Sequence, residues 1–79
     1  MYFIYILQSS KDYRTYVGYS HDVQNRLAQH NAGQVPATKD RRPLKLIFTE
    51  SFKTEQEAKK RELYWKSGAG RRKMKNLFK

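Results

Sequence analysis

An arginine and a histidine, Arg26 and His30, lie four residues apart in a segment with the pattern of an amphipathic helix. At about 100° per residue, both side chains border the apolar stripe formed by Val23 and Leu27, so neither points fully into water. The helix directly follows a stretch of β-forming residues that contains Gly18. A strand that turns at a glycine into a helix can hold a phosphate on its free backbone amides. We therefore expect this junction to hold the functional site.

A carboxylate on a later helix is the second group that could do chemistry. Glu62 is four residues after Ala58 and three before Trp65, so it shares their helical stripe and is aimed at the sheet. Carboxylates are seldom turned inward without a partner, because an unpaired buried charge is costly. Two interpretations remain open: a structural salt bridge, for instance with Arg26 or Arg61, or a metal-binding or catalytic role.

Strand-forming segments must position these groups. Residues 2–7 are aromatic and β-branched without polar alternation, which predicts a central strand covered on both faces. A polar, turn-prone segment leads to β-forming residues at 15–19, so the two strands are expected to form a hairpin. Gly18 is expected to end the second strand, where it permits φ > 0 or a close approach of the backbone to a ligand. Residues 44–51 predict a third strand.

Capping signals mark the helices between and after the strands. The first helix has Asp22 or Ser20 as its N-cap and Gly33 as its C-terminal stop. Residues 32–43 lack periodicity and contain two prolines, which predicts a mobile loop with a basic tip. The second helix opens with a capping box, Thr54 with Glu57, runs to about residue 67 and is expected to stop at the glycines at 68 and 70.

The apolar positions of the second half predict its packing face and a last helix. They are Ala58, Leu63, Tyr64 and Trp65, followed by Met74, Leu77 and Phe78 at the i, i+3, i+4 spacing of a short terminal helix. We therefore predict an α+β fold, with a small three-stranded, mainly antiparallel sheet flanked by helices in the order ββαβα plus a short C-terminal helix. Residues 1–79 are expected to form one domain with a basic C-terminal tail.

The chain is strongly basic, with 17 Lys and Arg against 7 Asp and Glu and a formal net charge of +10. Such an excess predicts a polyanionic partner, because binding phosphates releases their counterions. The alternative is that the charge only keeps a small protein soluble. The absence of cysteine excludes disulfides, zinc thiolates and a cysteine nucleophile. The apolar residues 2–7 are too few to span a bilayer, so we expect a cytoplasmic protein without a membrane partner.

Taken together, the chemical groups and their spacing resemble a known family. Two triplets at hairpin spacing, Phe3-Ile4-Tyr5 and Tyr16-Val17-Gly18, precede Arg26, a His30-Asn31-Ala32-Gly33 helix ending and the later Glu62. This pattern resembles the GIY-YIG nuclease superfamily over nearly the whole chain, and most closely its small single-domain bacterial members, the UPF0213-like endonucleases. Phe3 stands where glycine is usual and Val17 where isoleucine is usual, and both positions supply backbone or packing rather than reacting side chains.

The resemblance implies phosphodiester hydrolysis with one divalent metal ion, Mg²⁺ or Mn²⁺. Glu62 would hold the metal, which offsets phosphate charge and stabilises the leaving oxygen. Tyr5 and Tyr16 would flank the attacking water, and one of them, with Tyr16 preferred, would relay its proton. A free tyrosine has a pKa of about 10, so Arg26 would assist as the nearby cation and would also bind non-bridging oxygens. His30 would orient the tyrosine or the water, or accept the proton.

The same residues also have structural interpretations. Taken singly, Tyr5 and Tyr16 are typical of core aromatics of a hairpin, and His30 of a hydrogen-bonded helix histidine. The resemblance instead implies that five groups from two strands and two helices converge on one concave face, which favours a catalytic site.

The function that the resemblance implies is a DNA endonuclease or nickase, structure-guided or weakly sequence-specific, acting in repair or recombination as a monomer, as a weak dimer or with a protein partner. One alternative is a nucleic-acid-binding module with little or no catalysis, or one that needs a partner protein; another is a basic protein-interaction domain. The residues expected to contact nucleic acid are Gly18, Asn31, Arg14, Lys39, Arg41, Arg42, Arg71, Arg72 and Lys73.

Overall fold

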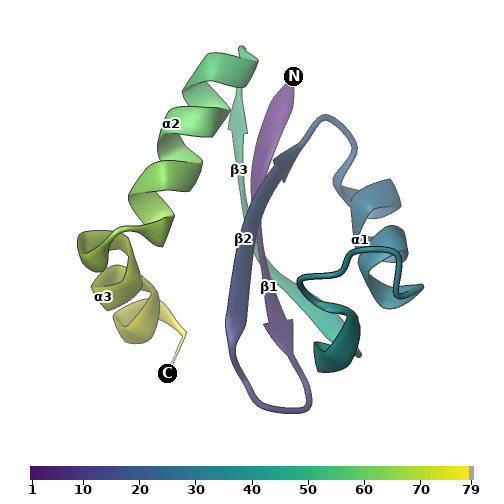
Figure 1. The fold of residues 1–79 in the computed structure, drawn as a ribbon. Helices are drawn as coiled ribbons and strands as arrows, with labels where there is room; N and C mark the ends of the chain where they lie inside the picture. The colour runs from purple at the N-terminus through teal and green to yellow at the C-terminus, as the bar shows by residue number, and fades with distance from the viewer. Residues whose placement is uncertain (79) are drawn as a thin grey trace.

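Three strands form one antiparallel sheet in the order β2-β1-β3, with the first strand of the chain in the middle (Figure 1). The computed structural model describes residues 1–78. Its elements are β1 (Tyr2–Ser9), β2 (Thr15–Ser20), α1 (Val23–Asn31), the 3₁₀ helix η1 (Lys39–Arg41), β3 (Leu44–Phe52), α2 (Glu55–Lys66) and α3 (Gly68–Leu77). The predicted α+β fold and its element order are therefore confirmed.

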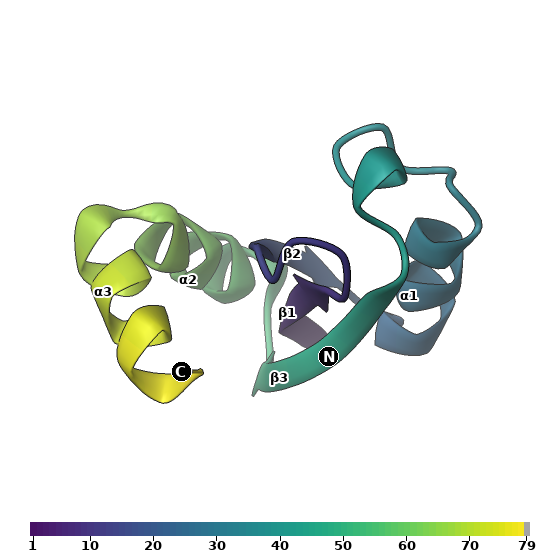
Figure 2. The same ribbon diagram turned by 90° about the horizontal axis from the view of Figure 1, so that it is seen from below.

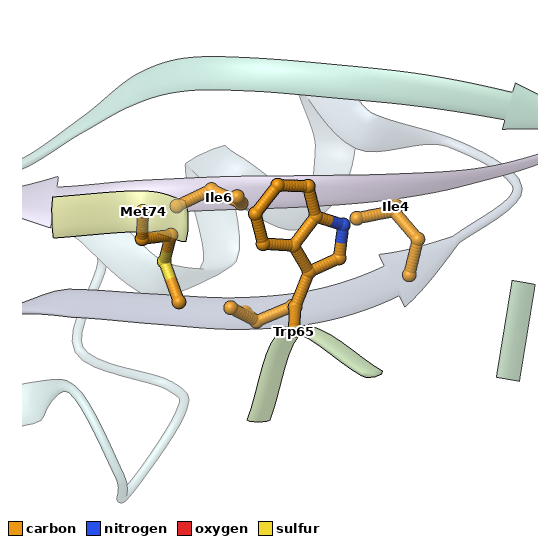
Figure 3. Close-up of a cluster of buried hydrophobic side chains, with 5 residues drawn as sticks. Ile4, Ile6, Trp65 and Met74 are labelled. Atoms are coloured by element: carbon orange, nitrogen blue, oxygen red, sulfur yellow. The ribbon is translucent and has the colours of Figure 1, made fainter. Parts of the chain in front are cut away.

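Helices cover both faces of the sheet, with α2 and α3 on one side and α1 with the loop after it on the other (Figure 2). On the first side, Ile4 and Ile6 of β1 pack against Trp65 and Met74 (Figure 3). Tyr5 points to the opposite face, toward the cluster that includes the apolar side chains of α1. Because successive side chains of a strand alternate between faces, β1 is buried on both, as predicted for a central strand.

The helix ends follow the capping signals in the sequence. The Asp22 carboxylate accepts a hydrogen bond from the Asn25 amide at 3.0 Å, and Gly33 follows α1 with a left-handed φ of 79°. Thr54 and Glu57 form both hydrogen bonds of the capping box that opens α2. Within residues 1–78, no helix combines the length and the apolar composition that crossing a membrane requires.

The glycines at 68 and 70 differ from the prediction, because they form the first turn of α3 rather than a stop. Ser67 is both the last cap of α2 and the N-cap of α3, and its Oγ accepts a hydrogen bond from the Gly70 amide at 3.3 Å. A Cβ atom at Gly70 would overlap the backbone of Tyr64 and Trp65. Glycine there lets the start of α3 lie directly against the end of α2.

Two leucines predicted to pack are exposed. Leu63 is 68% exposed, because α2 contacts the core through Ala58 and Trp65, and Leu63 lies outside that stripe. Leu77 is 52% exposed, whereas Phe78, the next residue, packs against the core and its ring centroid lies 6.0 Å from that of Phe48 in β3. The apolar face of the second half is therefore narrower than the sequence suggested.

The segment between α1 and β3, expected to be a mobile loop, is packed against the rest of the molecule. It contains η1 and buries Val35 and Thr38. Its end is tied to β1, since the Ser9 hydroxyl donates a hydrogen bond to the Arg41 carbonyl at 2.7 Å. The basic tip is present as predicted, with Lys39 and Arg42 exposed.

Candidate functional site

A cavity of about 480 Å³ opens beside β2, the edge strand that lies between α1 and α2 in the view of Figure 1. Tyr5 of β1, Tyr16 of β2, Arg26 of α1 and Glu62 of α2 all line it. Four of the five predicted catalytic or metal-binding residues thus reach one cavity from four elements. The fifth, His30, lies behind the cavity wall.

The two tyrosines and the histidine form a cluster of rings. The ring centroids of Tyr16 and His30 are 5.0 Å apart, and those of Tyr5 and His30 are 5.7 Å apart. Gly18 pairs with Tyr5 across the β1–β2 ladder, and a Cβ atom at Gly18 would overlap the hydroxyl end of the Tyr5 ring. The absence of a side chain at Gly18 thus leaves room for the Tyr5 ring rather than for a ligand. The prediction that Gly18 ends the strand is wrong, because β2 continues to Ser20.

His30 is fully buried and is hydrogen-bonded through both ring nitrogens. Its Nε2 is 3.0 Å from the Tyr5 hydroxyl, and its Nδ1 is 2.7 Å from the Thr38 hydroxyl. Burial lowers the pKa of His30 below 6.5, and the positive charge of Arg26 lowers it further. A neutral imidazole has one N–H, so one of the two hydroxyls accepts a hydrogen bond from the ring and the other donates to it.

The Tyr5 hydroxyl ends this buried chain of hydrogen bonds at the cavity. Tyr5 is 2% exposed, and burial raises the pKa of its phenol above 10.0 although the Arg26 guanidinium partly opposes the shift. The phenol is therefore held in its protonated form at neutral pH. Tyr16 is half-buried on the edge strand and lines the same cavity.

Arg26 reaches the cavity from the half-buried side of α1. Its Nη1 donates a hydrogen bond to the Gln29 side-chain oxygen at 2.9 Å, one turn further along the helix. This contact fixes the direction of the guanidinium, whose planar donors suit the oxygens of a phosphate.

Glu62 points into the cavity with 18% of its side chain exposed and pairs with Lys66 at 3.6 Å. The sequence left open a salt bridge of Glu62 with Arg61 or Arg26. The ion pair is with Lys66 instead, while Arg61 makes two hydrogen bonds to Glu50 of β3, at 3.0 and 3.2 Å, and Arg26 contacts Gln29.

The donor set around Glu62 fits a weakly held divalent cation. Among residues 1–78, no cluster of three or more His, Cys, Asp or Glu side chains could enclose a metal ion. Mg²⁺ commonly binds through one or two carboxylates, several waters and substrate phosphates. The Glu62 carboxylate can therefore hold such an ion together with water and a phosphate of bound nucleic acid.

The residues predicted to contact nucleic acid are divided among several places. Gly18 lines the cavity, while Arg14, Arg41 and Arg71 line a second hollow that shares Tyr16 with it. The other four cations predicted to contact nucleic acid lie outside the linings of both: Lys39, Arg42, Arg72 and Lys73.

Asn31 has a structural role at the end of α1. Its Nδ2 donates to the Leu44 carbonyl at 3.0 Å, and its Oδ1 accepts from the Leu44 amide at 2.8 Å. This pair of hydrogen bonds joins the end of α1 to the start of β3. Both ends of the amide thus serve the fold rather than face the cavity.

Three residues that contact site residues were not predicted as their partners. Gln29 and Lys66 stand three and four residues after Arg26 and Glu62, so helical spacing could have identified both as partners. Thr38 gave no comparable signal, because its contact with His30 depends on how the loop folds back.

Comparisons with known proteins agree with this architecture. Residues 1–76 match the family model described as the GIY-YIG catalytic domain. The UPF0213 protein SSP2268 of Staphylococcus saprophyticus is 41% identical over 94% of this chain and 90% of its own length. For the UPF0213 protein YazA of Bacillus subtilis, the identity is 42% over 98% of this chain and 76% of YazA.

The fold has a solved counterpart. The solution NMR structure of the UPF0213 protein BH0048 from Bacillus halodurans is similar, with a TM-score of 0.57 and 30% identity. The similarity covers 99% of this chain and 86% of that one. With a family model matched over nearly its whole length and relatives above 40% identity, the chain belongs to the GIY-YIG family.

Proposed function

We propose that this protein is a metal-dependent endonuclease that hydrolyses DNA phosphodiester bonds with structure-guided or weak sequence preference. The observation that carries the proposal is the convergence of Tyr5, Tyr16, Arg26 and Glu62 on one cavity from four elements. Such a set of hydroxyl, cation and carboxylate groups matches the needs of phosphodiester hydrolysis. Membership of a nuclease family supports the same reaction class.

In this proposal Glu62 holds one Mg²⁺ or Mn²⁺ ion, which supplies charge stabilisation at the phosphate and the leaving oxygen. Arg26 binds non-bridging oxygens with the donors that Gln29 leaves available. The phosphate thereby lies between the two helices, against the edge of β2.

The two tyrosines take different roles. Tyr16 relays the proton of the attacking water, releasing its own phenolic proton to solvent as it takes up that of the water, because it lines the open cavity and is only half-buried. Tyr5 is less suited to that role, since burial raises the pKa of its phenol and its hydroxyl is engaged by His30. Tyr5 and His30 instead orient the water and the ring of Tyr16.

The test is nicking of supercoiled plasmid by the full chain with Mg²⁺ or Mn²⁺. We expect cleavage that EDTA abolishes and that Glu62→Gln lowers about 100-fold or more. Asp40→Asn is the matched control, because Asp40 is an exposed carboxylate on η1 outside the cavity lining. Circular dichroism verifies that each variant is folded.

The same experiment separates the alternatives. Nucleic-acid binding that survives Glu62→Gln, with no metal-dependent cleavage of duplex, branched or single-stranded substrates, would identify a binding module instead of an enzyme. Absence of any salt-dependent nucleic-acid binding would leave a protein-interaction domain.

A further inference from the structure

A second hollow of about 630 Å³ begins at Tyr16 and extends beside β2 to the β1–β2 turn and to α3. We call it the basic groove, because the residues of 1–78 that line it include four cations and no carboxylate. The cations are Arg14 of the turn, Arg41 of η1, Lys66 of α2 and Arg71 of α3. The groove and the cavity share Tyr16, so a ligand can continue from one into the other.

The charge of the surface changes sign on the two sides of Tyr16. Besides Glu62, the cavity is lined by Asp22 and Glu55, and Arg26 is the one Lys or Arg among the lining residues that the structure describes. A phosphate chain that passes Tyr16 thus meets carboxylates in one direction and cations in the other. Electrostatic attraction therefore favours a phosphate chain that leaves the cavity past Tyr16 toward the cations of the basic groove.

The turn that borders the groove carries an aromatic ring held out toward solvent. Tyr13 is 74% exposed and has a left-handed φ of 61°, which residues other than glycine seldom adopt. Its amide donates to the Ser9 carbonyl at 3.0 Å, and its carbonyl accepts from the Gln8 side chain at 3.2 Å. The backbone of the turn is thereby fixed, and neither apolar cluster found among residues 1–78 includes the Tyr13 ring.

The wall of the groove is tied together across distant parts of the chain. The Ser9 hydroxyl accepts hydrogen bonds from the Lys11 and Asp12 amides and donates one to the Arg41 carbonyl. The Ser10 amide also donates to the Pro43 carbonyl at 2.9 Å. These hydrogen bonds hold the turn and η1 together, so Arg14 and Arg41 are fixed relative to each other along the groove.

From these features we propose that the basic groove binds one flank of the substrate, as an unpaired strand whose phosphates contact Arg14, Arg41 and Arg71 and whose base stacks on Tyr13. An exposed aromatic beside a cationic groove is the usual design for binding unpaired nucleic acid without reading its sequence. A paired base has both faces covered within the duplex and cannot stack on Tyr13. This inference rests on the proposed function, which makes the cavity the site of phosphodiester cleavage. It adds that the nucleic acid next to the cleaved bond is single-stranded and leaves the cavity along the basic groove.

Binding without cleavage tests the groove independently of catalysis. The full chain with Glu62→Gln is titrated in EDTA against a fluorescent single strand of about ten nucleotides and against a blunt duplex of the same sequence, by anisotropy. Tyr13→Asn removes the ring but tolerates a left-handed φ, and Tyr13→Phe keeps the ring. We expect Tyr13→Asn to weaken single-strand binding about fivefold or more, Tyr13→Phe to retain it, and duplex binding to change less than about twofold.

The cations are tested by the salt dependence of binding. Each lost phosphate contact lowers the slope of log K against log salt by about 0.7 for a single strand, so Arg14→Gln with Arg71→Gln should lower it by about 1.4. The matched control is Lys59→Gln with Lys60→Gln, which removes the same charge from exposed α2 positions outside the groove lining. The control pair should leave the slope within about 0.3 of the starting protein.

Three results would overturn the proposal: Tyr13→Asn without effect on the single strand, equal losses for single strand and duplex, or a control pair that lowers the slope as much as the groove pair. None of these depends on catalysis, since all are measured without metal. Conversely, a plasmid that is not nicked would contradict the proposed function while leaving these binding results unaltered.

Discussion

Replacing Thr38 by valine tests the buried chain of hydrogen bonds that ends at Tyr5. Valine keeps the shape of the threonine but removes the hydroxyl that lies 2.7 Å from His30 Nδ1. Both residues are completely buried, so water cannot take the place of the hydroxyl without opening the core. An imidazole nitrogen left without a partner costs about 1–3 kcal/mol of folding free energy.

The expected loss is measurable by thermal and urea unfolding. For a domain of this size, 1 kcal/mol corresponds to a shift in Tm of about 4–8 °C, so Thr38→Val should lower Tm by at least about 4 °C. Thr38→Ser keeps the hydroxyl and loses one methyl group, at a cost of up to about 1 kcal/mol. Thr49→Val, at an exposed position on β3, is the control and should stay within about 0.5 kcal/mol.

A result within about 0.5 kcal/mol of the wild type for Thr38→Val would refute the reasoning. A double-mutant cycle provides a second check. Tyr5→Phe removes the hydroxyl at the other nitrogen of His30, so the two substitutions act on one ring. We expect their effects to deviate from additivity by at least about 0.5 kcal/mol, whereas independent sites would add.

Three further perturbations have defined outcomes. The unfolding free energy should fall as pH drops from about 7.5 to about 5.5, because the unfolded chain takes up a proton on His30 near 6.5 while burial holds its folded pKa lower. Urea unfolding across that range should give a flatter profile for His30→Gln, and an equal slope would contradict this assignment. Gly18→Ala should cost about 1–3 kcal/mol in thermal unfolding, since its Cβ overlaps the end of Tyr5, and it should cost less in a Tyr5→Phe background, where the overlapping hydroxyl is absent; an unchanged Tm would disprove the overlap. Glu50→Gln should cost about 1 kcal/mol or more in urea unfolding at neutral pH, because a charged acceptor for Arg61 and Trp65 is lost. Burial opposes the charge of Glu50, but those two donors lower its pKa overall, so wild-type stability should fall below about pH 4.5 and the variant should lose less; greater stability of the variant at neutral pH would count against this role.

The fold was predictable where local patterns and tertiary packing agree. An unbroken apolar run predicts the central place of β1, and helical spacing predicts Arg26 at the border of the buried face of its helix and Glu62 on the inward stripe of the later one. Each of these conclusions needs only the period of a strand or a helix. The cavity follows from the fold, because β2 is an edge strand between the helices that carry those two side chains.

The predictions failed where the outcome depends on how neighbouring elements pack rather than on a local period. Thr38 lies in a segment without periodicity, and only the folded loop brings it to His30. The glycine at 70 has the composition of a helix stop, yet it serves the close crossing of two helices, which the sequence around it does not reveal. Leu63 is apolar, but it lies outside the stripe of α2 that Ala58 and Trp65 bury.

The position of β2 at the edge of the sheet affects how copies of the protein meet in solution. An uncovered edge strand offers unpaired backbone groups to any second strand, and this is a route to aggregation. Here the cations beside β2, within a chain of formal charge +10, oppose the approach of a second copy at that edge. Salt shortens the range of this repulsion to about 10 Å at 0.1 M, so aggregation through this edge should be weakest at low ionic strength.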